Sequence, residues 1–340
     1  MVDYITYENI IIFSPKFNKL LESELLFNYK KIIFSDYELN DYLFEAYKNN
    51  NLNNLKYISS KFNQHLSNSF DKLKLLTHLT FGDNFNQPLA NSLLSLTSLT
   101  NLTFGIKFNQ PLSNSLGSLT SLTHLTFYHY GDFNTPLANS LQSLTSLTHL
   151  TFGYDFDQPL VNSLDKLISL THLTFGGIFN QPLNNSLGCL TSLTHLTFGV
   201  RFNQPLDNSL DKLLSLTHLE LGFHFNQKND LLPNIKSIGI NCNNSYYTDF
   251  LPSSIEEIKL GLKFVLELDN LPGSVKQISF NRESDYNKEL NCLPNGLEIL
   301  QLPEKYNLQI KNIPKGLKKL ICDKDYPFIN DFLGLEVGYY

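Results

Sequence analysis

Hydrophobic and polar residues recur along the chain with one long period and one short one. The dipeptide Phe-Asn, replaced once by Phe-Asp, recurs every 23 residues, with a single spacing of 25. Within each unit, a segment such as Leu193–Phe198 alternates apolar and polar residues, which is the pattern of a half-buried strand. The dipeptides begin at Phe62, Phe85, Phe108, Phe133, Phe156, Phe179, Phe202 and Phe225.

The alternation predicts one short parallel strand in each unit. Leu196 and Phe198 should point inward, and His195 and Thr197 outward. The Asn-Ser pair ahead of Leu210 is typical of an N-cap on a brief helical or 3₁₀ turn. A period of about 20 to 29 residues with an LxxLxF core is typical of leucine-rich repeats. We therefore expect a leucine-rich-repeat-like solenoid, a single elongated domain with a parallel β-sheet on one face and short helical or 3₁₀ turns on the other.

The FNQPL segment gives two further expectations. Its proline cannot donate a hydrogen bond to a β-ladder, so it belongs in the arc that connects strand and turn. The repeated Asn should stack from coil to coil and bind turn backbone that would otherwise lie unpaired. Asp157 replaces this Asn once, and because an ionised carboxylate cannot donate, we expect a local defect in the ladder there.

The pattern continues on both sides of the regular units. Degenerate coils are expected near the N-terminus, with strands at Ile11–Phe13, Tyr29–Phe34 and Leu52–Tyr57. In the C-terminal coils, Lys and Glu alternate at one strand position and should pair across neighbouring strands. The predicted divisions are N-terminal coils or cap in 1–60, regular 23-residue repeats in 61–227, shorter LPxxIxxIxL repeats in 228–324 and a C-terminal cap in 325–340.

The FNQPL, NSL and SLTHLTFG segments, with the later LPxxIxxIxL units, resemble the FNIP repeats. These are leucine-rich-repeat-like repeats of amoebal and giant-virus proteins, and the resemblance covers residues 62 to about 322, with Gln at the third place of the name motif. It implies an interaction scaffold. Some members carry an N-terminal F-box that docks a ubiquitin-ligase core. The strand positions account for residues 1–60 better, so a divergent F-box there, and a substrate-adaptor function, is an alternative.

Composition and charge narrow the partners. The net charge of -6 provides no basic surface for phosphates, so nucleic acid is not expected as a partner. No apolar run reaches the roughly 18 residues of a membrane span, and the start lacks the pattern of a signal peptide. We expect a monomer in the cytoplasm, which would be the host-cell cytoplasm for a viral protein. The four cysteines lack CxxC spacing and are expected to be buried free thiols.

A histidine column is the most site-like feature of the repeat. Imidazoles on adjacent strands could bind a metal, but no Cys or carboxylate column completes a coordination sphere, so we expect a structural ladder without metal or cofactor. The neighbouring Thr column gives an ice- or surface-binding alternative, although the outward pair is His-x-Thr. GxSxG, P-loop, HExxH and GxGxxG motifs are missing from the sequence, so an enzyme is not expected. The column contains His78, His124, His149, His172, His195 and His218, with Asn101 completing it.

The single 25-residue spacing indicates a partner site. Two extra residues must bulge from the end of a strand in the segment Phe127–Phe133. Tyr128, His129 and Tyr130 lie in this segment, and Tyr154 follows one coil later. Tyrosine is enriched at binding hot spots because it combines apolar area with a polar tip. We therefore predict a non-catalytic scaffold that binds a protein through its sheet face and rim, with these four residues at the contact.

Overall fold

The computed structural model of the 340-residue chain shows a repeated coil with one strand in each turn of the solenoid. It describes residues 10–13, 31–35, 63, 65–66, 70, 74–112, 115–206, 208–227, 235–243 and 251–340, with the backbone alone for the first two ranges. The chain divides into two compact units. The first contains Met1–Gly176 and Cys189–Thr191, and the second contains Gly177–Gly188 and Ser192–Tyr340.

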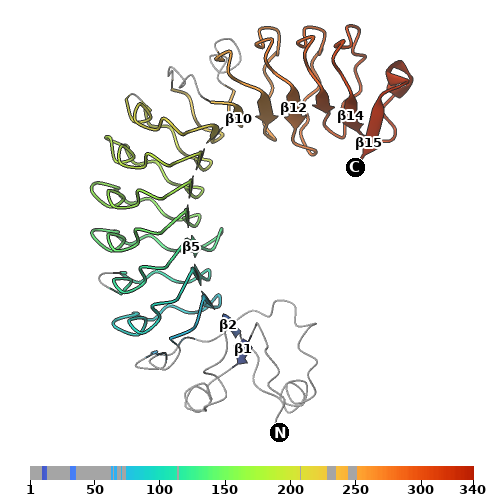
Figure 1. Ribbon diagram of the computed structural model, residues 1–340. Helices are drawn as coiled ribbons and strands as arrows, with labels where there is room; N and C mark the ends of the chain where they lie inside the picture. Colours follow the sequence, from blue (N-terminus) through green and yellow to red (C-terminus); the bar gives the residue numbers. More distant parts are fainter. Residues whose placement is uncertain are drawn as a thin grey trace. The chain divides into compact units, whose positions relative to one another are not determined.

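Strands lie along one side of the coils in each unit, and turns lie along the other (Figure 1). The predicted alternation is confirmed in the regular repeats, where Leu196 is 1% exposed and its neighbours His195 and Thr197 are half-buried. The strand pairs described in the structure are all parallel. The regular strands are β3 (His78–Thr80), β4 (Asn101–Phe104), β5 (His124–Phe127), β6 (His149–Thr151), β7 (His172–Thr174), β8 (His195–Thr197) and β9 (His218–Leu221).

The strand register places equivalent residues of successive repeats beside each other. In the β4–β5 pair, Asn101 lies opposite His124 and Phe104 lies opposite Phe127. Because the units have nearly the same length and sequence, each side chain packs mainly against copies of itself. The repeat is therefore a device for stacking identical residues into columns.

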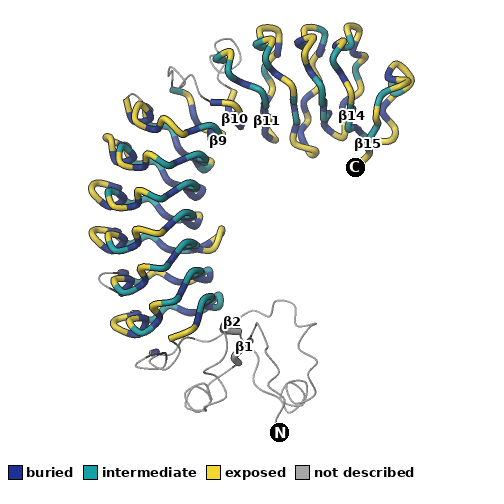
Figure 2. The backbone as a smooth tube through the Cα atoms, in the orientation of Figure 1, coloured by how far each residue is buried: buried dark blue, intermediate teal, exposed yellow. Residues whose placement is uncertain are grey.

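Two phenylalanine columns and several leucine columns form the core, and buried residues line the inside of the described coils (Figure 2). Phe104 stacks on Phe127 of the next coil at 5.3 Å and on Phe108 of its own coil at 4.0 Å, measured between ring centroids. Phe108 continues the second column onto Phe133 at 6.0 Å. These rings are at most 1% exposed, so each contributes a large apolar area to the interface between neighbouring coils.

Separate turns, and not helices, form the side of the coil opposite the strand. The N–H groups of Ser92, Leu96 and Leu99 each donate to the carbonyl three residues earlier, at 2.9 to 3.0 Å. These are short turns of the 3₁₀ type, as predicted, and within the described ranges one continuous 3₁₀ helix, η3 (Ile329–Phe332), is found. The N-cap predicted at the Asn-Ser pair was wrong, because Asn208 has a left-handed φ of 55° whereas an N-cap residue is extended.

The predicted asparagine ladder is present. The side-chain oxygen of Asn134 accepts hydrogen bonds from the N–H of Asp157 and from Nε2 of Gln158, both at 2.9 Å. The same pattern joins Asn86 to Asn109 and Gln110 of the next coil at 2.9 Å. The reason given for a defect at Asp157 was wrong, because the ladder uses the side-chain oxygen as an acceptor and a carboxylate accepts as well. The glutamine that shares this oxygen was not anticipated.

The shorter C-terminal coils carry one strand in each LPxxIxxIxL repeat and one more. The additional strand, β15, pairs with β14 inside the segment predicted as a cap. Its sequence, EVGY, lacks the inward apolar alternation that marked the others, and only two of its four residues are half-buried. The strands of this part are β10 (Ser237–Ile240), β11 (Glu257–Leu260), β12 (Gln277–Phe280), β13 (Ile299–Gln301), β14 (Lys319–Cys322) and β15 (Glu336–Tyr339).

The alternating charges of these coils pair across strands as predicted. Glu256 contacts Lys276 at 2.7 Å and Lys236 at 3.8 Å, and Glu298 contacts Lys318 at 2.8 Å. The Lys276 ammonium lowers the pKa of Glu256 through this hydrogen bond and its charge. All these groups are at the surface, so the ladder sets which coils are neighbours more than it adds stability.

Near the N-terminus, β1 (Ile10–Phe13) pairs with β2 (Lys31–Ser35), at two of the predicted positions. β2 then pairs directly with β3, placing Lys31 opposite His78. The strand expected at Leu52–Tyr57 lies outside the described residues.

Candidate functional site

The 25-residue unit places a small exposed loop directly after β5. The loop closes where the N–H of Gly131 donates to the carbonyl of Tyr128 at 2.7 Å, and the N–H of Asp132 returns to the carbonyl of Ile106 at 2.7 Å. Tyr128 and Tyr130 are 39% and 66% exposed. The two extra residues therefore extend outward while the coil below keeps its normal hydrogen bonds.

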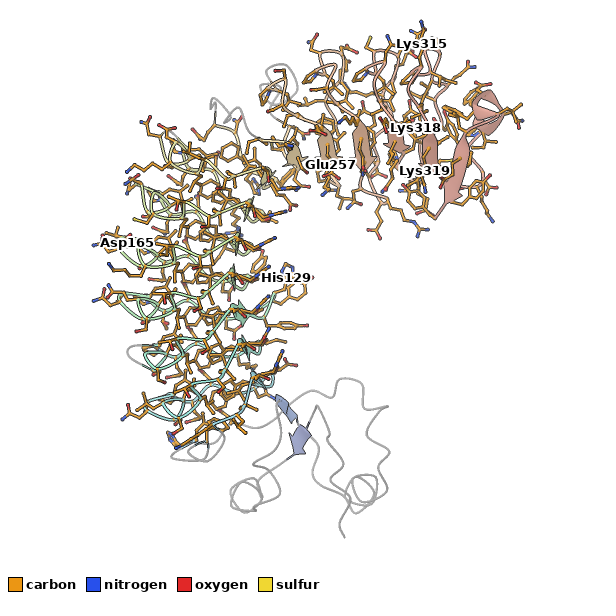
Figure 3. The ribbon with its side chains drawn as sticks, viewed as in Figure 1. His129, Asp165, Glu257, Lys315, Lys318 and Lys319 are labelled. Atoms are coloured by element: carbon orange, nitrogen blue, oxygen red, sulfur yellow. The ribbon has the colours of Figure 1, made fainter. Side chains whose placement is uncertain are left out.

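The rings of His129 and Tyr130 contact each other edge to face in this loop, with their centroids 4.6 Å apart and an interplanar angle of 67°. Figure 3 shows His129 on the strand side of the first unit, away from the turn that carries Asp165. Tyr154 is 36% exposed on the next coil. Gly153 precedes it, and a β-carbon at Gly153 would lie 2.6 Å from the Tyr128 carbonyl oxygen. A glycine is thus needed where the two coils that carry the tyrosines approach each other.

The histidine column consists of stacked, nearly parallel rings. In the first unit, His149 lies between His124 and His172, with ring centroids 4.2 Å apart on both sides. In the second unit, His195 and His218 stack at 3.9 Å with an interplanar angle of 12°. His78 on β3 lies opposite Asn101, which separates it from the other histidines of its unit.

A threonine before each histidine fixes the ring, and sequence reasoning missed this residue. Oγ1 of Thr123 donates to the carbonyl of Thr100 on the previous coil at 3.0 Å. The same oxygen contacts Nδ1 of His124 at 2.9 Å. Because the hydroxyl has one proton and the carbonyl takes it, the Nδ1 atom must donate to Oγ1. The proton of the neutral ring is therefore on Nδ1, and Nε2 is the acceptor.

The environment of the column favours neutral rings. Burial, followed by the charges of His124 and His172, lowers the pKa of His149 below its usual value of 6.5. Burial is also the main cause that lowers the pKa of His218. Parallel rings direct their Nε2 lone pairs side by side and not toward one point, which does not suit chelation. Across the described ranges, no group of three or more His, Cys, Asp or Glu is arranged to hold a metal ion.

A shallow hollow of about 100 Å³ lies on the sheet face of the second unit, where the histidine column ends. Sequence reasoning did not identify it, although small residues at both outward positions of β10 were a possible signal. Ser237 and Gly239 occupy those positions, between the larger side chains of β9 and β11. The polar side chains that line the hollow are His195, Thr197, His218, Glu220, Ser237 and Lys259.

The four cysteines are free thiols, but only two are buried as predicted. Cys242 and Cys322 point into the core, whereas Cys189 and Cys292 are exposed. Cys189 occupies a turn position that holds Ser or Lys in other repeats, and its described copies are half-buried or exposed. In the described part of the chain, no helix has the length and apolar character of a membrane span.

Comparison with known proteins separates the fold from the function. A family model described as "N-acetylglucosaminyl transferase component (Gpi1)" matches residues 70–222, which hold the regular repeats. Comparison with curated proteins finds no match.

Among solved structures, the chain is similar to a leucine-rich-repeat protein of Leptospira interrogans, with 17% identity, 98% of this chain and 93% of that chain covered, and a TM-score of 0.55. It is similar to a chain of the Toll–Spatzle complex of Drosophila, with 14% identity, 94% and 47% coverage, and a TM-score of 0.60. CroV588, a circular LRR protein, has 25% identity, 92% and 60% coverage, and a TM-score of 0.39. The chain thus spans 60% of CroV588 and about half of the Toll-complex chain. The parallel strands and the near absence of helix among the described residues, together with the likeness to the Leptospira and Toll-complex chains, show a leucine-rich-repeat-like solenoid.

Proposed function

We propose that the chain is a non-catalytic scaffold that binds a protein partner through the rim formed by Tyr128, His129, Tyr130 and Tyr154. The observation that carries this proposal is the outward loop after β5, which exposes aromatic side chains without disturbing the coil that supports them. Such side chains are costly to leave in water and are typical anchors of interfaces. The FNIP-like repeat pattern and the likeness to a chain of a two-protein complex support the same class of function.

The experiment has two stages. Proteins captured from the native host cell by the wild-type chain are first identified and produced in pure form, and their affinities are then measured with wild type and with the double variant Tyr128→Ala, Tyr130→Ala. We expect the double variant to weaken binding by at least about 1 kcal/mol, or roughly fivefold, without changing the thermal midpoint, because both side chains are exposed. The matched control is Tyr339→Ala on β15, where the tyrosine is 58% exposed. Equal affinity of the double variant and wild type would exclude this rim.

The family-model match gives the rival function, a component of an N-acetylglucosaminyl transferase. Its range of 70–222 covers repeated residues that form the core columns, the Asn–Gln ladder and the Thr–His column. These structural tasks account for the recurring side chains, so we favour binding over group transfer. Turnover of a nucleotide-activated N-acetylglucosamine donor by the purified chain and its captured partners would instead support the transferase component.

The ligase-adaptor alternative depends on residues 1–60, of which the structure describes only β1 and β2. It predicts that a purified F-box-binding ligase core forms a complex with the full chain and that deleting residues 1–60 abolishes it. The scaffold function proposed above predicts no such complex.

A further inference from the structure

The end of the histidine column leaves one face of a ring uncovered by another ring. His195 stacks on one face of His218 at 3.9 Å. On the other side, the strand register places Ser237 opposite His218, where a further histidine would continue the stack. Ser237 is smaller than histidine and lines the hollow described above. A flat group could take the place of the missing ring.

One carboxylate, that of Glu220, lines this space, and a second, that of Glu257, contacts two of its lining residues. Oε2 of Glu257, labelled in Figure 3, accepts a hydrogen bond from Oγ of Ser237 at 2.5 Å and contacts Nζ of Lys259 at 3.2 Å. On the opposite side, the stem of Glu220 leans over Gly239, where a β-carbon would come within 2.8 Å of its Cγ atom. Oε1 of Glu220 has one long contact, 3.5 Å from Nδ2 of Asn241. Glu220 therefore keeps most of its acceptor capacity for a ligand.

We propose that this slot, between His218 and Glu257 above Ser237, binds the guanidinium group of an arginine from a partner polypeptide. A guanidinium is planar and can stack on the imidazole face as the next ring of the column would. Its N–H groups lie in its plane and point sideways, toward the carboxylates of Glu220 and Glu257. A lysine ammonium would satisfy the charge but not the stacking, and an aromatic ring would stack without satisfying the carboxylates.

The charges that face the slot are consistent with a cation. Glu220 and Glu257 are balanced in part by Lys259, which is already paired with Glu257. Burial lowers the pKa of His218, so the ring is neutral at neutral pH and does not repel a guanidinium. His195 lies behind His218 and completes the set of titratable groups that line the hollow. The inference rests on the proposed function, since it requires a protein partner.

The test uses small probes and the full chain. The arginine probe is N-acetyl-arginine methylamide, and two matched probes change one property each: the citrulline analogue is planar but uncharged, and the lysine analogue is charged but not planar. Binding is followed by the ring-proton NMR signals of His218 in histidine-labelled protein. Three variants accompany wild type: Ser237→His fills the slot, Glu257→Gln removes one carboxylate charge, and Gln277→His adds the same ring to the column two strands away as a control.

We expect saturable shifts of the His218 signals by the arginine probe, with the citrulline and lysine probes at least about fivefold weaker, because charge-assisted bonds are roughly twice as strong as neutral ones and the ammonium cannot stack. Ser237→His should abolish arginine binding, Glu257→Gln should weaken it and Gln277→His should leave it unchanged. Equal binding of arginine and citrulline, unchanged arginine binding by Ser237→His, or no saturable shift would overturn the proposal. If the slot fails while the tyrosine rim still governs partner affinity, the proposed function stands. If the probe binds as expected but the tyrosine rim does not affect the affinity of a captured partner, the proposed rim fails and the slot stands.

Discussion

Replacing Tyr286 by Phe should stabilise the protein, although the residue is almost completely buried. Tyr286 is 2% exposed and packs against Phe264 and Phe280, with ring centroids 5.9 and 4.5 Å away. Its hydroxyl is buried and makes no hydrogen bond to any described residue. Burial correspondingly raises the pKa of Tyr286 far above its usual value.

The equivalent tyrosines of the next two coils provide internal controls. The hydroxyl of Tyr306 donates to the carbonyl of Lys288 at 3.1 Å, and that of Tyr326 donates to the carbonyl of Leu308 at 2.8 Å. Both carbonyls lie 18 residues earlier in the chain, so the two bonds are the same contact in successive coils. Tyr286 occupies the same place in its coil but lacks this bond.

The expected free-energy changes differ in sign. An unpaired buried hydroxyl costs about 1 to 3 kcal/mol, and removing it leaves only a small void, so Tyr286→Phe should raise the free energy of unfolding by about 1 kcal/mol. A satisfied hydroxyl contributes about 0.5 to 1.5 kcal/mol, so Tyr306→Phe and Tyr326→Phe should each lower it by about 1 kcal/mol. The two classes should therefore differ by about 2 kcal/mol for one and the same chemical change.

Urea unfolding monitored by circular dichroism is the appropriate assay, because the chain has no Trp to report by fluorescence. Repeat arrays can unfold in parts, so the comparison is between midpoints of the transition that includes β12 to β14. A loss of stability in Tyr286→Phe equal to that of the two controls would refute the reasoning. It would mean that the hydroxyl has a partner, such as an ordered water.

Three further predictions test the columns. Burial and neighbouring histidines lower the pKa of His149, so the unfolded chain binds this proton more readily and the free energy of unfolding should fall as pH drops below about 6.5. His149→Asn should reduce this loss, measured as the urea midpoint between neutral and acidic pH. The same dependence of the midpoint on pH in the variant and in wild type would contradict the prediction. Asn134→Ala should cost about 1 to 3 kcal/mol through two lost hydrogen bonds, whereas Asn134→Asp should stay near wild type, and equal damage would show that the ladder needs the amide. Gly222→Ala should lower the free energy of unfolding by about 1 to 3 kcal/mol, because its β-carbon would lie 1.8 Å from a carbonyl oxygen. A β-carbon at Gly273 meets nothing within 4 Å, so Gly273→Ala is the control, and both variants are compared with wild type in thermal melts.

The repeat pattern predicted which residues lie beside their own copies. The strand position of His124, the inward Phe127 and the coil-to-coil placement of Asn134 follow from a fixed spacing and a period-two alternation, whereas the use of the Asn134 side-chain oxygen as an acceptor was not predicted. Contacts between unlike residues were not predictable in this way. The threonine that fixes each imidazole and the glutamine that shares the Asn oxygen depend on side-chain geometry that no spacing reveals.

Where the repeat pattern changes, less of the structure could be predicted from the sequence. The strand β15 lacks the apolar alternation, so nothing in its four residues distinguished it from a cap. An N-cap was predicted because Asn and Ser are good caps, but Asn also tolerates the left-handed backbone that Asn208 adopts, which an N-cap does not have. The hydroxyls of Tyr306 and Tyr326 each reach a carbonyl 18 residues earlier, whereas that of Tyr286 does not. The repeat pattern does not reveal this difference.

The physics of such an array explains why its distinctive chemistry occurs at irregular places. In a column, each side chain is surrounded by its own copies, so its polar groups are satisfied by the repeat and offer a partner the same surface on every coil. A surface that occurs at one place only requires a break in the repeat pattern. The two extra residues after β5 are one such break, because they lift Tyr128 and Tyr130 out of the columns. The change from His218 to Ser237 is another, because it ends a stack and leaves a ring face near two carboxylates. Both breaks lie on the strand side of their own unit, where hydrogen bonds between coils hold the main chain, so a partner would meet a backbone that is already formed before it binds.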